Sequence, residues 1–209
     1  MQLQASLYVL DLAAVFVFAL SGGLAAARKQ LDIVGFIVVG MLTGIGGGTL
    51  RDLLIGVRPV FWVFQPEYLL SCTLGGILAF FAAPRIERRL RALSIADAFG
   101  LALGTVIGTQ KALDYAAPEV VAVLMGVLTA AAGGIARDVL CNEIPLILRR
   151  EIYALAAVLG GSVYLLIQMA DGPRWLALAV AVPLTFAIRV WAVLTKASLP
   201  SYGGRPPEG

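Results

Sequence analysis

The sequence predicts an all-α membrane protein of seven transmembrane helices, built as two inverted three-helix repeats plus a seventh helix. Composition is the first observation behind this prediction, because 60% of the 209 residues are hydrophobic, 14% are charged and the mean hydropathy is +0.90. A soluble domain carries about a quarter charged residues to cover its surface. The second and third observations are seven long apolar segments and an internal duplication.

The seven apolar segments come close to the length of about 20 residues that a bilayer crossing requires. The first is not expected to be a cleaved signal peptide, because no Lys or Arg precedes it whereas Arg28 and Lys29 follow it. The second and fifth contain runs of glycine, and the third is the shortest. The predicted segments are residues 7–27, 33–57, 68–83, 95–113, 119–141, 152–170 and 174–195.

These segments predict one transmembrane domain over residues 1–197, followed by a disordered tail at 198–209 that contains Pro and Gly. Within the domain, repeat one covers about residues 5–84, repeat two about 94–171 and the seventh helix about 174–195. Because each repeat holds three crossings, an odd number, the second repeat enters the membrane upside down relative to the first.

Basic residues in the loops predict the orientation. With seven crossings and the C-terminus inside, the outer face holds only Arg58, Lys111 and Arg174. This imbalance predicts an external N-terminus and a cytoplasmic C-terminus. The stretch Arg85–Arg91 is interpreted as a cytoplasmic anchor able to bind anionic lipid headgroups. The inner face holds Arg28, Lys29, Arg85, Arg88, Arg89, Arg91, Arg149, Arg150, Lys196 and Arg205.

The duplication rests on a gapless alignment of residues 11–59 with residues 97–145. Hydrophobic bias alone would match leucine with leucine, but it would not match glycine pairs, charged pairs and proline at one offset. The chain is therefore interpreted as an inverted repeat, a class in which transport sites lie near the membrane midplane. Matching pairs are Asp11 with Asp97, Gly47-Gly48 with Gly133-Gly134, Arg51-Asp52 with Arg137-Asp138, Pro59 with Pro145 and, past a one-residue deletion, Tyr68 with Tyr153.

Glycine runs lie about halfway along the second segment and at the matching depth of the fifth. Adjacent glycines favour a helix bend, and the carbonyls that a bend frees are tolerated at this depth only in protein or along a water-filled path. The alternative is packing, since small residues every fourth position let helix backbones approach closely. Both roles are expected to coexist here, whereas the glycines at 100, 104 and 108 are interpreted as packing alone. The predicted kink residues are Gly46, Gly47, Gly48, Gly133 and Gly134.

Charged and polar residues also fall inside the predicted spans. Such ionisable groups usually pair, line a cavity or mark an ion path, so fixed ion pairs and a pore lining both remain open for the intramembrane charges Arg51, Asp52, Arg137 and Asp138. Since neighbours in a helix point in different directions, each arginine is expected to find its partner elsewhere. The candidate pore-lining polar residues are Ser21, Thr43, Thr49, Thr105, Thr109 and Thr129, although threonines in membrane helices often bond their own backbone.

Several functional classes find little support. The chain has no histidine, which removes the usual general base and the commonest metal ligand, so an enzyme is not expected. Cys72 and Cys141 fall in or beside apolar runs and are interpreted as small hydrophobic side chains. The net charge of +3 does not indicate nucleic acid, because the cations sit at helix ends. The glycine run lacks the lysine and the preceding strand of a phosphate-binding loop.

The paired motif Gly-Gly-x-x-Arg-Asp, the prolines Pro59 and Pro145 that follow it, and the seven-helix layout resemble the prokaryotic trimeric intracellular cation (TRIC) channels. The resemblance covers about residues 5–197 and implies a homotrimer in which each subunit carries its own pore. That pore would run between the first, second, fourth and fifth helices and pass monovalent cations, chiefly potassium. No cofactor is implied, while permeant potassium or sodium and bound lipid are expected ligands. The same broader family has also been interpreted as a glycine-type transporter.

The leading hypothesis is thus a potassium-permeable cation channel, and the alternative is a secondary transporter of a small solute such as glycine. A buried arginine would repel cations unless a neighbour neutralises it. The bend hypothesis predicts that leucine in place of Gly47 and Gly134 stops flux while leaving the assembly folded.

Overall fold

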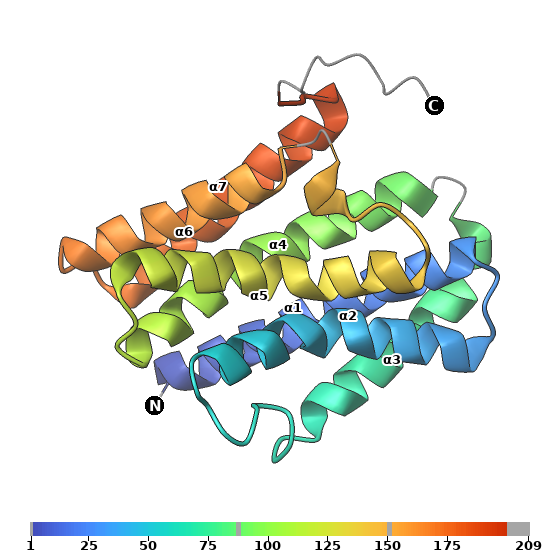
Figure 1. Ribbon diagram of the computed structural model, residues 1–209, viewed down its shortest axis with the longest axis horizontal. Coiled ribbons are helices and arrows are strands. Elements are labelled where there is room, and N and C mark those ends of the chain that lie inside the picture. The colour runs from blue at the N-terminus through green and yellow to red at the C-terminus, as the bar shows by residue number, and fades with distance from the viewer. Residues whose placement is uncertain (1, 87–88, 150–151, 200–209) are drawn as a thin grey trace, which may run out of the picture.

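The computed structural model of the chain describes residues 2–86, 89–149 and 152–199, and these form an antiparallel bundle of seven α-helices (Figure 1). The described part of the chain contains no β-strand, so the predicted fold class is confirmed. The predicted tail falls largely outside the described residues, as do residues 87 and 88 of the predicted basic anchor. The helices are α1 (Gln2–Arg28), α2 (Ile33–Leu54), α3 (Glu67–Ala82), α4 (Arg89–Asp114), α5 (Glu119–Leu140), α6 (Ala154–Met169) and α7 (Arg174–Thr195), with 3-10 turns η1 (Ala83–Arg85) and η2 (Leu146–Leu148).

Helix boundaries differ from the predicted segments where capping chemistry intervenes. Asp32 caps α2 by accepting a hydrogen bond from the Gly35 amide at 2.8 Å. The helix ends three residues before the predicted boundary at 57, because Gly56 adopts a φ of +77° that turns the chain away. Helix α4 begins at Arg89 rather than at 95.

Six helices are long and apolar enough to cross a membrane, and α6 at 16 residues is the short apolar one. The third segment was expected to be the shortest, but α3 continues into η1 and gives an apolar span of 19 residues, Glu67–Arg85. Seven crossings therefore require α6 to pass the thinnest part of the bilayer or to lie against protein.

The two repeats meet along their central helices. Burial is greatest for α1 and α4, in which 56% and 67% of the apolar stretch is buried, against 28% for α7. Helix α1 packs against α2, α3 and α4, and α4 packs in turn against α5, α6 and α7. Helices α2 and α5 lie side by side and run in opposite directions (Figure 1). The four helices α1, α2, α4 and α5 thus enclose the centre of the molecule.

Ion pairs at the two ends of the bundle show which helix ends share a face, and they agree with seven helices that each cross the membrane. Glu143, just beyond α5, pairs with Arg28 at the end of α1 and lies 3.6 Å from the Lys29 ammonium. At the opposite end, Arg174 at the start of α7 contacts Asp114 at the end of α4 at 2.6 Å. The ends of α1 and α5 therefore share one face, and the end of α4 shares the other with the start of α7.

Candidate functional site

Asp52 organises a buried charge cluster near the C-terminal end of α2. Its Oδ1 accepts hydrogen bonds from Nε and Nη2 of Arg51, at 2.9 and 2.8 Å. Its Oδ2 accepts the backbone N–H of Phe61 at 3.0 Å, which ties the loop after α2 to the helix. Lys111 of α4 brings a second cation to the same carboxylate at 2.9 Å. Arg51 and Asp52 are both buried.

A second carboxylate completes this group of side chains. Asp11 of α1 accepts a hydrogen bond from the Tyr68 hydroxyl of α3 at 2.7 Å. Asp11 also lines the same small cavity as Arg51. We call the whole group the repeat-one cluster, which consists of Asp11, Arg51, Asp52, Tyr68 and Lys111.

The second repeat builds a corresponding arrangement around its own Arg-Asp pair. Arg137 of α5 donates through Nε to Asp138 Oδ1 at 2.7 Å, and Asp138 Oδ2 accepts the backbone N–H of Leu146 at 2.9 Å. Asp97 of α4 accepts from Nη1 of Arg137 at 2.9 Å, and the same nitrogen donates to Ser21 of α1. We call this the repeat-two cluster, which consists of Ser21, Asp97, Arg137, Asp138 and Tyr153.

Helix α7 adds a cation that the sequence analysis left aside. Arg189 is buried and its guanidinium carbon lies 4.9 Å from the centre of the Tyr153 ring. A cation over an aromatic face is attracted by the ring quadrupole. The non-repeated helix therefore supports the repeat-two cluster.

The expectation that each arginine would find its partner elsewhere was wrong for Arg51 and incomplete for Arg137. The long arginine side chain folds back onto the carboxylate of the next residue, so differing directions at Cβ do not prevent contact. Arg137 does reach a second helix through Asp97. The Arg-Asp pair is thus a local unit, whose aspartate also holds the loop that follows its helix.

The sequence pointed to four of these residues only through the duplication. Asp11 and Asp97 align, as do Tyr68 and Tyr153, and each aspartate lies beside its own Arg-Asp motif. Ser21 was a predicted polar candidate, and the structure places it in the repeat-two cluster. Lys111 aligns with an alanine at position 25, so nothing in the repeat indicated its contact with Asp52.

The glycine runs bring α2 and α5 into backbone contact. A Cβ atom at Gly47 would collide with the carbonyl of Thr129, and one at Gly133 would collide with the carbonyl of Thr43. Gly46 lies against the same contact, because its Cβ would come 3.5 Å from the Cα of Gly133. Gly47 and Gly133 therefore serve close helix packing, whereas a side chain at Gly46 would make an ordinary contact.

The remaining two glycines lie next to the charge clusters. A Cβ on Gly48 would come 2.7 Å from the Phe61 ring, whereas one on Gly134 would find Arg137, Asp97 and Tyr153 at 3.5–3.7 Å. Both helices are continuous α-helix through the glycine runs, so bending at these positions stays a prediction. Leucine at Gly47 is no longer expected to leave the assembly folded.

The predicted threonines divide into two groups. The hydroxyls of Thr43, Thr49 and Thr129 each donate to the carbonyl four residues before them, at 2.6–2.7 Å. Of these, Thr129 lines the central cavity, while Thr49 accepts a bond from the Trp62 ring nitrogen on an outer groove.

The hydroxyls of Thr105 and Thr109, both on α4, have no hydrogen-bond partner among the described residues although they are buried. The same holds for Asp97 Oδ2 and Arg137 Nη2 in the repeat-two cluster. A buried polar atom without a partner costs about 1–3 kcal/mol, and buried water commonly satisfies such atoms. The repeat-two side of the bundle therefore favours hydration.

A small cavity lies between α1, α2, α4 and α5. Its volume is about 20 Å³, and a cavity of this size holds about one water molecule. The lining includes Asp11 and Arg51 at its polar side, Phe18 at its apolar side, and Thr129. An ion with its hydration shell does not fit in a cavity of this volume.

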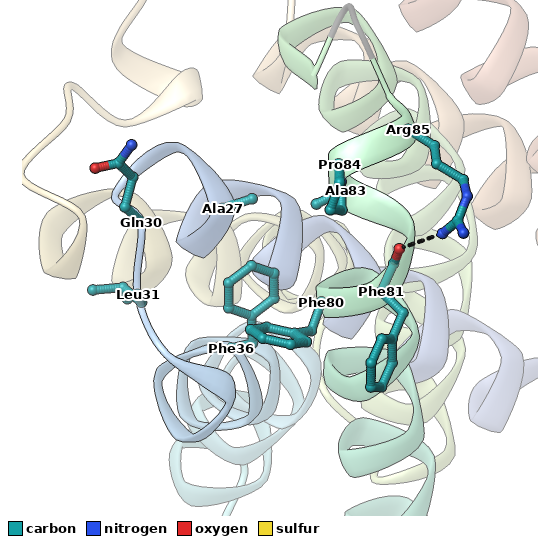
Figure 2. A pocket seen from close by; sticks show the side chains of 9 residues that line it. All are labelled: Ala27, Gln30, Leu31, Phe36, Phe80, Phe81, Ala83, Pro84 and Arg85. Atoms are coloured by element: carbon teal, nitrogen blue, oxygen red, sulfur yellow. Dashed lines mark hydrogen bonds between the residues drawn. The ribbon is translucent and has the colours of Figure 1, made fainter.

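A larger, apolar hollow opens at the end of the bundle where α1 and α3 end. It has a volume of about 800 Å³. Figure 2 shows the rings of Phe36 and Phe80 packed edge to face beside the hollow, while Arg85 turns away from them and donates to the Phe81 carbonyl at 3.0 Å. Among the described residues that line this hollow, none belongs to either charge cluster.

Comparison with known proteins gives a consistent result. The family model described as "Glycine transporter" matches residues 8–84 and 94–169. The UPF0126 inner membrane protein YadS of Escherichia coli (strain K12) is 40% identical over 93% of this chain and 95% of its own.

Two solved structures share the fold over nearly their whole length. The TRIC trimeric intracellular cation channel orthologue from Rhodobacter sphaeroides is 42% identical with a TM-score of 0.89, over 92% of this chain and 99% of that one. A prokaryotic TRIC channel solved in 0.5 M KCl is 30% identical with a TM-score of 0.87, over 94% and 100%. The resemblance predicted from the paired motif is confirmed. These neighbours are channels, which agrees with the predicted non-enzymatic class.

Proposed function

This chain belongs to the family that the glycine-transporter model describes and that includes the solved TRIC channels, and from this premise we propose that it is a membrane cation channel permeable to potassium. The path lies inside one subunit, between α1, α2, α4 and α5. It connects the repeat-one cluster near one membrane face with the repeat-two cluster near the other.

The observation that carries this proposal is the pairing of the two clusters through the centre of the bundle. Helix α1 contributes Asp11 to one cluster and Ser21 to the other, and the cavity lies beside the stretch between them. Buried ionisable groups are expensive in a membrane protein and mark ion pathways when they face an interior cavity. Two such groups at matching positions of an inverted repeat define the ends of one route.

Charge compensation removes the main objection to cation passage. Arg51 contacts Asp52, and Asp11 lines the same cavity as the guanidinium. Arg137 contacts two carboxylates, those of Asp97 and Asp138. Because the guanidinium groups of Arg51 and Arg137 are each neutralised by at least one carboxylate, a passing cation does not meet an unpaired positive charge at either motif.

We further propose that the protein works as a homotrimer in a prokaryotic inner membrane, with the N-terminus outside and the C-terminus in the cytoplasm. Trimeric channels among its structural relatives support the assembly, and the distribution of basic residues supports the orientation. The permeating potassium or sodium ion is cargo rather than a resident cofactor. Lipid acyl chains fit the apolar hollow beside Phe36 and Phe80.

The purified protein in planar bilayers is expected to give discrete unitary currents in potassium chloride. Liposomes with the same protein are expected to take up no labelled glycine above the level of empty liposomes. Unitary currents require an open aqueous path, whereas a carrier moves its solute through occluded states.

The second candidate function is a secondary transporter of a small amino acid. The inverted repeats and the description of the matching family favour it, because inverted repeats are typical of carriers that rock around a midplane site. Saturable glycine uptake without unitary currents would establish this candidate and exclude the channel.

A further inference from the structure

We infer that the aromatic ring of Phe18 is the apolar gate of the path, a side chain that lies between the repeat-one cluster and the repeat-two cluster. This inference rests on the proposed channel function and names the narrowest point of the same route. Phe18 is buried on α1, in the middle of the membrane span Tyr8–Arg28.

The position of Phe18 along α1 places it between the two polar groups. Seven residues make about two helical turns, so Phe18 lies on the same face as Asp11. Ser21 lies about one turn further on and bonds Arg137. The rise from Asp11 to Ser21 is roughly 15 Å, about half of the hydrocarbon thickness of a bilayer. An ion that moves between the clusters along α1 must pass the ring.

The ring also closes the gap between α1 and α4. A Cβ atom on Gly100 would come 2.6 Å from the Phe18 ring, and one on Gly104 would come 3.2 Å from it. Real Cβ contacts essentially never fall below 3.0 Å, so α4 has to present glycine where the ring lies. The spacing of these glycines was interpreted from the sequence as helix packing, and the partner that they accommodate is this side chain.

The duplication explains why one ring suffices. At the offset that aligns Asp11 with Asp97, Phe18 aligns with Gly104, and the two residues are in contact. A residue and its repeat equivalent touch each other only near the pseudo-two-fold axis, which passes through the middle of the path. A second phenylalanine at position 104 would occupy the space of the first. At this midpoint the two repeats therefore differ, because one contributes an apolar ring and the other a glycine.

The position of Phe18 between two polar groups is the one that a hydrophobic gate requires. A hydrophobic constriction closes a channel by excluding water, and a small rotation or displacement of the constricting group rewets it. The cavity on the repeat-one side of Phe18 has room for about one water molecule. On the repeat-two side, Asp97 Oδ2 and Arg137 Nη2 are buried and have no hydrogen-bond partner within the described part of the chain. The surroundings on both sides of the ring are thus polar enough to hold water, whereas the ring itself is apolar and excludes it.

The test compares wild type with Phe18→Ala, Phe18→Leu and Phe99→Ala in planar bilayers at equal protein density. Phe99 is the matched control, because it lies on α4 next to Gly100 but is 40% exposed and pairs with Phe186. Phe18→Ala is expected to raise the fraction of time that the channel is open several-fold, and Phe18→Leu to raise it less. Phe99→Ala is expected to behave as wild type.

Size-exclusion chromatography shows whether each variant is folded. If Phe18→Ala does not fold, Phe18→Leu carries the test, since leucine removes the ring but keeps most of its bulk. The gate would be overturned if the wild type conducts and every folded Phe18 variant is open for the same fraction of time as the wild type. That result would leave the channel proposal intact. Absence of unitary currents from wild type and variants alike would overturn the channel proposal and the gate with it.

Discussion

Replacing Gly47 with alanine is expected to prevent the protein from reaching a stable fold. The added Cβ would collide with the backbone carbonyl of Thr129 on α5, and a backbone atom cannot move aside as a flexible side chain can. Overpacking of a well-packed interior typically costs about 1–3 kcal/mol and more where backbone must shift. Gly133→Ala is expected to have the same effect through the carbonyl of Thr43.

This prediction is tested by measuring, for each variant, the yield of monodisperse protein in mild detergent and the thermal unfolding midpoint. Gly46→Ala and Gly134→Ala are the matched controls, since the nearest atoms to their new Cβ lie 3.5 Å away, an ordinary contact. Both controls are expected to purify with a midpoint close to wild type. A Gly47→Ala protein as stable as these controls would show that α2 and α5 do not touch as described.

Removing the arginine of the second motif is expected to destabilise the protein more than removing that of the first. Arg137→Ala leaves Asp97 and Asp138 buried without their cation, and breaking a buried pair in this way costs about 3–5 kcal/mol. Arg51→Ala leaves Lys111 at 2.9 Å from Asp52, so one positive charge remains. Thermal unfolding in detergent should therefore show a larger loss for Arg137→Ala.

The double variant Arg51→Ala with Lys111→Ala provides the check on this reasoning. It removes both cations from Asp52 and is expected to lose stability as Arg137→Ala does. Equal midpoints for Arg51→Ala and Arg137→Ala would contradict the account of how the two clusters differ.

The duplication carried most of what the sequence could predict about the site. Alignment of the repeats placed Arg51-Asp52 on Arg137-Asp138 and Asp11 on Asp97, and the structure builds both clusters from these residues. A repeat predicts that equivalent residues have equivalent surroundings. It cannot predict which side chains of other helices complete those surroundings, because such contacts depend on how the helices cross.

The residues that break the symmetry show this limit. Lys111 and Ser21 each join one cluster, yet their repeat equivalents are Ala25 and Ile107, so the alignment offers no signal for either contact. Arg189 lies on the helix that has no repeat partner. Phe18 aligns with a glycine, and its role follows only from the distances across the pseudo-two-fold axis.

The glycine pattern of α2 and α5 could not by itself distinguish a helix bend from close packing, and the reason is physical. A glycine can permit a bend or a close approach, and the same residue type serves both. Both roles were expected at positions 46–48, and the contacts of α2 with α5 now assign close approach to Gly47 and Gly133. Movement of these helices during opening remains a prediction.

The reversal potential of the reconstituted protein under a potassium chloride gradient tests the central claim most directly, because it reports which ion crosses the path. Since Arg51 and Arg137 are both paired with aspartates, the account predicts a reversal potential close to the potassium equilibrium potential. A reversal potential close to that of chloride would contradict it, since the guanidinium groups would then govern the path.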